Sequence, residues 1–140
     1  MRSYVTRVVY GDPSRGRGAK GAIVLVYGRF PKRTHPAAES YLNLLFDEKT
    51  VVSLLERLKR SSMTGFKAKD IFRASGLSLL GVSNSHVEKD LTKIREGTKL
   101  SPLLLVRHGD RPKVIIADGY HRLCAVYSVD EDAVIPCKIA

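Results

Sequence analysis

The second half of the chain alternates apolar runs with turn residues, and this pattern predicts most of its secondary structure. Residues 103–107 and 113–117 are short runs rich in apolar and β-branched side chains, so we expect them to pair as a hairpin across the turn-like HGDRP. Helical spacing begins after Asp118-Gly119 and ends at the acidic VDED. A last strand is expected over residues 133–139.

The segment before the hairpin has a helical period. Pro36 is expected to open a first helix, and a second is expected to run to about Arg60. The second carries apolar side chains at i, i+3, i+4 and i+7, namely Val51, Leu54, Leu55 and Leu58. Residues 66–75 have no clear period and end before a possible stop at Gly76. Ser85-His86-Val87-Glu88 has the form of a capping box, which predicts a third helix ending near Gly97.

Residues 1–33 form a basic N-terminal arm. The net charge of the chain is +10, and eight of its 24 basic residues precede His35, against one acidic residue, Asp12. Residues 4–10 and 22–30 predict two strands around GDPSRGRGAKG; the alternative is a partly disordered leader. Such a charge favours DNA or another polyanion. The candidate nucleic-acid contacts are Arg15, Arg17, Lys20, Arg29, Lys32 and Arg33.

The remaining residues, 34–140, are expected to form a single α+β domain. Hydrophobic residues make up 44% of the chain and charged residues 27%, which is ordinary for a globular protein. No apolar run is long enough for a bilayer, and no secretory signal is visible. Cys124 and Cys137 have no metal-ligand or redox spacing, so we expect a cytoplasmic protein with reduced thiols.

The stretch IADGYHRLCA, residues 116–125, places polar side chains where a strand is predicted to become a helix. Asp118 is suited to cap that helix, and Gly119 allows close approach of a ligand to the backbone. The free N–H groups of a helix start attract anions, Arg122 can add a bidentate fork, and His121 can donate a hydrogen bond or move a proton. The alternative is that Asp118 only caps while His121 and Arg122 face solvent.

Three segments, LSPLLLVR, KVIIADGYHRLCAVY and AVIPCKI, together resemble the ParB and sulfiredoxin superfamily. The resemblance covers about residues 66–140. It implies a small mixed-sheet core, here preceded by a helical segment, in which a Gly-x-x-Arg turn binds nucleotide phosphates. It therefore implies that Gly119 and Arg122 bind phosphate, with Tyr120 and His121 beside them.

The branches of this superfamily differ at the turn. Sulfiredoxins carry a cysteine directly after the turn glycine, where this chain has Tyr120, so we do not expect their reductase reaction; Cys124 is expected in the core. Asp118-Gly119-Tyr120-His121-Arg122 is similar to the Asp-Gly-His-His-Arg of free serine kinases. That similarity implies a phosphotransferase in which Asp118 and His121 assist transfer from ATP, ADP or CTP with Mg²⁺. The glutamate base of those kinases aligns with Asn84, which cannot accept a proton.

A different function remains open within the same resemblance. Partition ParB proteins bind CTP and clamp DNA with the help of further domains, whereas the chain ends at Ala140, so we do not expect a complete clamp. A DNA-binding accessory protein that uses the basic arm is the alternative to a phosphotransferase. We expect a nucleotide or phosphorylated small molecule as the ligand, no metal site built from protein side chains alone, and no membrane partner.

Overall fold

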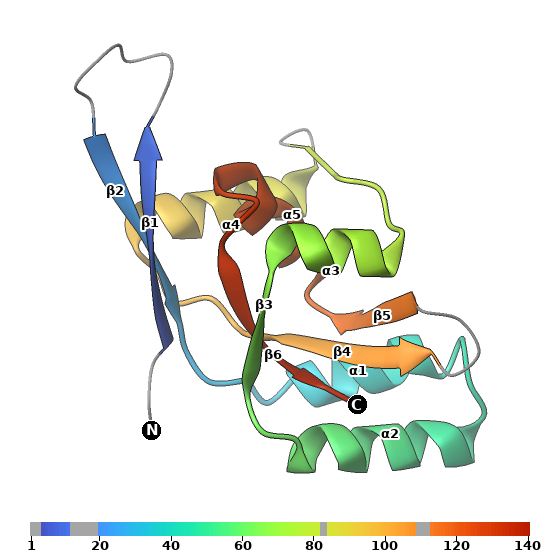
Figure 1. Ribbon diagram of the computed structural model, residues 1–140. Coiled ribbons are helices and arrows are strands. Elements are labelled where there is room, and N and C mark those ends of the chain that lie inside the picture. Colours follow the sequence, from blue (N-terminus) through green and yellow to red (C-terminus); the bar gives the residue numbers. More distant parts are fainter. Residues whose placement is uncertain (1–3, 12–19, 82–83, 109–112) are drawn as a thin grey trace.

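The computed structural model describes residues 4–11, 20–81, 84–108 and 113–140, with side chains from Leu25 onward. Its centre is a mixed four-stranded sheet in the order β3-β6-β4-β5 (Figure 1). The strands are β3 (Thr64–Lys67), β4 (Leu103–His108), β5 (Lys113–Asp118) and β6 (Val134–Ile139). β4 runs parallel to β6 and antiparallel to β5, while β3 is antiparallel to β6. The predicted α+β class is confirmed.

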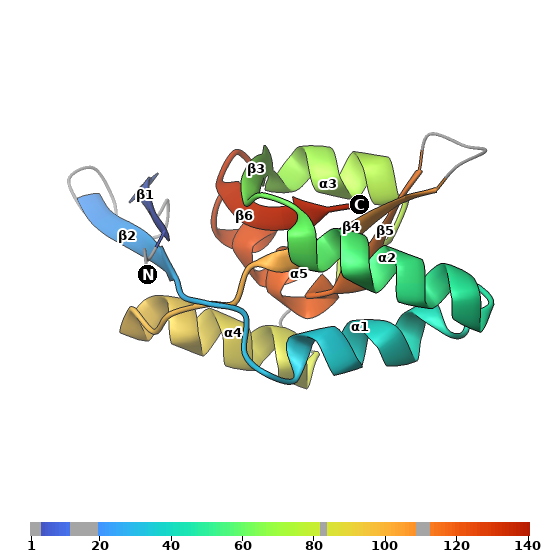
Figure 2. The same cartoon turned by 90° about the horizontal axis from the view of Figure 1, so that it is seen from below.

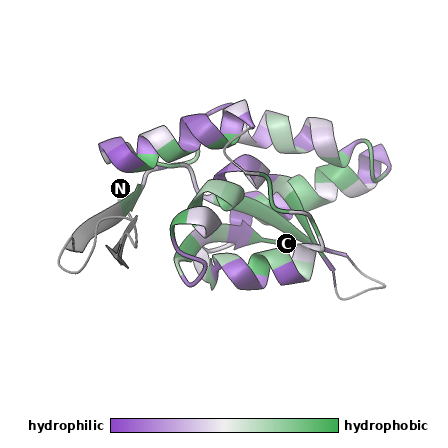
Figure 3. Cartoon of the chain, turned by 90° about the horizontal axis from the view of Figure 1, so that it is seen from above, coloured by the Kyte–Doolittle hydropathy of each residue, from purple (hydrophilic) through white to green (hydrophobic). Residues whose placement is uncertain are grey.

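Helices cover both faces of this sheet (Figure 2). α1 (Thr34–Leu42) and α2 (Glu48–Arg60) pack on one face; α3 (Ala68–Ser75), α4 (Ser85–Glu96) and α5 (Tyr120–Val129) pack on the other. Successive side chains of a strand point to opposite faces, so Leu103 and Leu105 enter the core under α5 while Leu104 and Val106 enter the core under α1 and α2. Figure 3 shows the apolar strands enclosed between helices with polar outer surfaces.

The predicted hairpin, the helix after Gly119 and the last strand are confirmed as β4–β5, α5 and β6. α2 ends at Arg60, as its period predicts, and α1 begins at Thr34. The segment without a clear period contains a short strand, β3, followed directly by α3. Gly76 ends α3 with a φ of +67°, a left-handed conformation that glycine adopts readily.

The expected capping box at the start of α4 is wrong by one residue. The N-cap is Asn84, whose side-chain oxygen accepts hydrogen bonds from the backbone N–H groups of His86 at 3.0 Å and Val87 at 3.3 Å. Glu88 instead approaches Arg95 at 3.9 Å. An asparagine oxygen can satisfy the first free amides of a helix as well as a serine hydroxyl can, so the spacing in the sequence fitted either residue.

The N-terminal arm contains an antiparallel pair, β1 (Tyr4–Gly11) and β2 (Lys20–Tyr27). β2 is joined to the domain because the Leu100 N–H donates to Val26 and the Gly28 N–H donates to Leu100. Arg15, Arg17 and most of the glycine-rich loop lie outside the described residues, and Lys20 is described only by its backbone. Among the helices that the structure describes, none is long and apolar enough to cross a bilayer.

Candidate functional site

Gly119 connects β5 to α5 in a conformation that requires glycine. It is the N-cap of α5 with a φ of +107°, and a Cβ there would collide with Leu103 and lie 2.8 Å from Nη2 of Arg122. No side chain caps this helix. The expectation that Asp118 caps α5 is therefore wrong: its carboxylate turns to Arg122, and the first amides of α5 receive no side-chain cap.

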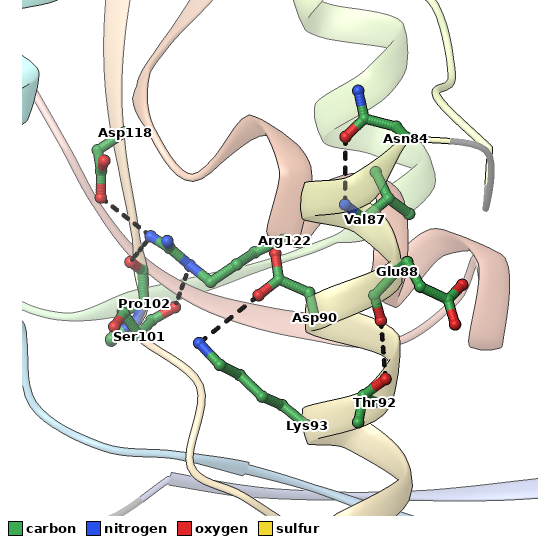
Figure 4. A network of polar contacts seen from close by, with 10 residues as sticks. All are labelled: Asn84, Val87, Glu88, Asp90, Thr92, Lys93, Ser101, Pro102, Asp118 and Arg122. Carbon is green, nitrogen blue, oxygen red and sulfur yellow. Dashed lines mark hydrogen bonds and ion pairs between the residues drawn. The ribbon is translucent and has the colours of Figure 1, made fainter.

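Arg122 holds the turn together (Figure 4). Its Nη2 donates to Asp118 at 3.0 Å and to Pro102 O at 3.2 Å, and its Nε donates to Ser101 O at 3.0 Å. The Asp118 and Arg122 side chains are each 20% exposed. The alternative in which Arg122 simply faces solvent is therefore wrong, because its guanidinium ties β5, α5 and the segment before β4 to one another.

One nitrogen of the Arg122 guanidinium, Nη1, donates no hydrogen bond to a described residue. The three bonds of the guanidinium use Nε and Nη2. Gly119, the uncapped N-cap of α5, lies beside the guanidinium, since a Cβ there would be 2.8 Å from Nη2 and 3.3 Å from Cζ. Fixed N–H donors, a positive charge and the partial charge of a helix N-terminus favour an anion at this place.

Asp90 on α4 faces the same region and was missed from the sequence. Only 9% of the residue is exposed, and its carboxylate points toward the Arg122 side chain (Figure 4). Burial raises the pKa of Asp90, against the opposing charges of Arg122, Lys93, His121 and His86. A signal was present, since Asp90 lies three residues after Val87 on the buried stripe of α4, where an acidic residue is unusual.

His121 lies against a second histidine from α4. The ring centroids of His86 and His121 are 4.8 Å apart. Burial, with the charge of His86 next in size, lowers the pKa of His121, while Asp90 opposes that shift. His121 is therefore biased toward the neutral form, which can either donate or accept a proton. No pattern in the sequence indicated this pair, because the two residues are brought together only by the packing of α4 on α5.

Two buried polar atoms near the turn have no partner among the described residues: the Tyr27 hydroxyl and His35 Nε2. Burial raises the pKa of Tyr27, and the charge of Arg122 opposes that change. Burial, followed by the charges of Lys59 and Lys138, lowers the pKa of His35, while Asp118 raises it. Buried polar groups usually have partners, so these two atoms leave hydrogen-bonding capacity near the Asp118–Arg122 pair.

Tyr120 and Cys124 have packing contacts. The Tyr120 hydroxyl donates to Ser78 O, and the Cys124 sulfur accepts from the Leu80 N–H at 3.5 Å. Cys124 is fully buried, as expected, and burial raises the pKa of its thiol, which disfavours the reactive thiolate. Tyr120 is thus tied to the segment after α3, beside the turn at which the sequence placed it.

Arg29, Lys32 and Arg33 are exposed on the connection between β2 and α1. No ion pair or hydrogen bond joins them to Asp118 or Arg122 within the described part of the chain. These three basic residues are therefore not part of the hydrogen-bonded turn around Arg122. Elsewhere in the described ranges, no group of three or more histidine, cysteine or carboxylate side chains is arranged to hold a metal ion.

The chain matches no known protein family, no curated protein and no solved structure.

Proposed function

We propose that this protein binds a nucleotide or a related phosphate ligand at the turn formed by residues 118–122. The observation that carries the proposal is the guanidinium of Arg122, which three hydrogen bonds hold in place beside Gly119, the N-cap of α5 that no side chain caps. A fixed positive charge with unused N–H groups at a helix start suits a phosphate. The resemblance to the ParB and sulfiredoxin superfamily supports the same ligand.

Charge balance favours a divalent cation with that ligand. The Asp118 carboxylate is 3.0 Å from Arg122, so a phosphate bound at the guanidinium would lie close to a negative group. Mg²⁺ commonly uses one or two carboxylates together with phosphate oxygens. ATP, ADP or CTP with Mg²⁺ fits this arrangement, with Asp118 as the carboxylate that would hold the ion.

The reaction that we propose for this site is phosphoryl transfer to a small hydroxyl compound. Such transfer depends mainly on positioning and on neutralising charge, for which Arg122 is placed. Asp118 and His121 are the proposed catalytic groups, and the lowered pKa of His121 leaves its neutral imidazole able to accept a proton. Asp90 supplies the carboxylate on α4 that Asn84 does not.

A panel of nucleotides tests the binding step. Ligands that bind the folded state raise the unfolding temperature, so we expect ATP, ADP or CTP with Mg²⁺ to do so and the corresponding nucleosides to have no effect. Arg122→Lys keeps the charge but loses the planar guanidinium that Asp118, Ser101 and Pro102 hold in place, and it should remove most of the shift. Arg95→Lys, an exposed arginine of α4, is the matched control. A wild-type protein that no nucleotide stabilises would refute the proposal.

Turnover tests the reaction separately. We expect the wild-type protein to consume its nucleotide when a mixture of small hydroxyl compounds is present, and His121→Gln to lower that rate by about 10²-fold or more. His121→Gln should still bind nucleotide. Tight binding without any turnover would remove the phosphotransferase and retain the binding function.

DNA binding is a second candidate because three basic side chains, Arg29, Lys32 and Arg33, are exposed and form no ion pair with a described residue. Replacing all three with alanine should weaken DNA binding and reduce its dependence on salt by about three phosphate contacts. The control replaces Arg57, Lys59 and Arg60, three basic residues in the last turn of α2. An equal loss in both triple variants would contradict a specific role for the arm.

A further inference from the structure

A cavity lies between α3 and the sheet, away from the turn at Gly119. Its volume is about 230 Å³. α3 covers this part of the sheet (Figure 1), and the lining comes from β3, α3, β4, β5 and β6. The lining residues are Phe66, Asp70, Ile71, Ala74, Leu105, Arg107, Val114 and Ile139.

The wall of this cavity is apolar and built into the fold. Leu105 is 1% exposed and Ile71 3%. Leu105 is paired in register with Ile139 on the neighbouring strand, and Val114 is paired with Arg107. Side chains two residues apart on a strand share a face, so Arg107 emerges on the same face as Leu105. The cavity therefore has an apolar wall and a charged side chain at its rim.

The rim carries two opposite charges that do not neutralise each other. Asp70, from the first turn of α3, and Arg107, from β4, both line the cavity. No ion pair joins them, and within the described residues Arg107 has no carboxylate partner. Asp70 has only a long contact of 3.8 Å to Arg73, whose side chain is 83% exposed, and such surface pairs are weak. Both charges are thus available to a ligand.

We propose that this cavity binds the zwitterion of a free aliphatic amino acid of about the size of leucine. The ligand's carboxylate pairs with Arg107, its ammonium group pairs with Asp70, and its side chain packs among Ile71, Leu105 and Val114. A cavity of about 230 Å³ is smaller than the pockets that hold drug-sized ligands, which favours a small ligand. A ligand with a single charge would leave one rim charge unmatched. This site is independent of the proposed phosphate site.

Nuclear magnetic resonance titrations test the proposal directly. We expect L-leucine to shift backbone amide signals of α3 and β4, with a dissociation constant on the order of 1 mM, because one small side chain and two exposed charges supply the affinity. Two analogues each lack one charge: 4-methylpentanoate has no ammonium group, and 3-methylbutylamine has no carboxylate. Each should bind about two- to fivefold more weakly than leucine.

Two variants assign the charges. Arg107→Gln should reduce leucine binding to the level of 3-methylbutylamine, and Asp70→Asn should reduce it to the level of 4-methylpentanoate. Both residues lie at the rim, so the fold should persist, and Arg57→Gln and Glu56→Gln on α2 are the matched surface controls. The proposal is wrong if about 20 mM leucine shifts no signals near the cavity. It is also wrong if both analogues bind as well as leucine, or if the two rim variants behave like the controls.

Discussion

Gly119 begins α5 with a φ of +107°, a conformation that side chains with a Cβ rarely adopt. An alanine at this position would also press against Leu103 and Arg122. We expect Gly119→Ala to lower the free energy of unfolding by about 2–4 kcal/mol, from backbone strain together with overpacking. Urea denaturation followed by circular dichroism measures this change.

A substitution at Gly97 separates the effect of backbone strain from that of overpacking. Gly97 has a similar left-handed φ of +71°, but a Cβ there would meet no atom within 4 Å. Gly97→Ala should therefore show strain alone, about 1 kcal/mol. Equal losses in the two variants would mean that the close approach of Gly119 to Arg122 has no energetic weight.

Asp90 links stability to pH at the same site. Because burial raises its pKa above that of the unfolded chain, the stability that its neutral form contributes is full below the unfolded pKa of about 3.9. That contribution is lost as the pH rises through the folded pKa. Asp90→Asn cannot ionise, so we expect the stability of the wild type relative to this variant to fall as the pH rises above about 4 and through the raised pKa of Asp90.

Urea titrations of both proteins across that range provide the measurement. Glu56→Gln removes an exposed carboxylate from α2. It is the control that shows how the loss of a surface charge alone changes the dependence of stability on pH. The opposite result would be a wild type whose free energy of unfolding rises relative to that of Asp90→Asn as the pH rises. It would show that the favourable charges outweigh burial in setting the pKa of Asp90. Those charges are on Arg122, Lys93, His121 and His86.

At the scale of elements, the start of α4 shows how two caps of similar sequence are distinguished. Asn84 accepts two backbone N–H bonds, whereas Ser85 is already the first residue of the helix. Asn84→Ala should cost about 1 kcal/mol, whereas Ser85→Ala, within the first turn, should cost nothing because alanine is the better helix former. Thermal unfolding of the two single variants tests this order. A larger loss of stability from Ser85→Ala than from Asn84→Ala would support Ser85 as the N-cap of a capping box.

The elements that the sequence predicted are those whose signals are local. β4 and β5 have apolar alternation on either side of a turn, and α2 has a helical period. β3 has four exposed residues and exists because Phe66 pairs with Ile135, far along the chain. No local pattern encodes such a partner.

The residues of the candidate site likewise fall into two groups: those close together in the sequence and those brought together only by packing. Asp118 and Arg122 lie four residues apart, a spacing at which two side chains meet on a helix or its cap, and the sequence alone placed both in the site. Tyr27, His35 and Asp90 reach the site from β2, α1 and α4, so only the packed fold reveals them. Long-range packing is also why the guanidinium of Arg122 proved to be held by three hydrogen bonds.

At the scale of the whole molecule, one sheet separates two hydrophobic cores. The core under α1 and α2 contains Leu58, and the core under α3, α4 and α5 contains Leu123; both side chains are fully buried. β4 contributes alternate residues to both cores, so neither can melt while the other keeps an intact sheet. We therefore expect the helical segment before the sheet to be part of one cooperative unit.

Truncation of either core should weaken the same unfolding transition. We expect Leu58→Ala and Leu123→Ala each to cost about 2–5 kcal/mol. Circular dichroism and tyrosine fluorescence should then report one coincident transition in every variant. Val52→Ala, at a half-exposed position of α2, should change stability far less. If Leu58→Ala instead split the curve, so that α1 and α2 melted before the sheet, the two cores would be separate units. The proposed phosphate site would then lose the nearby His35 of α1 before it lost Arg122.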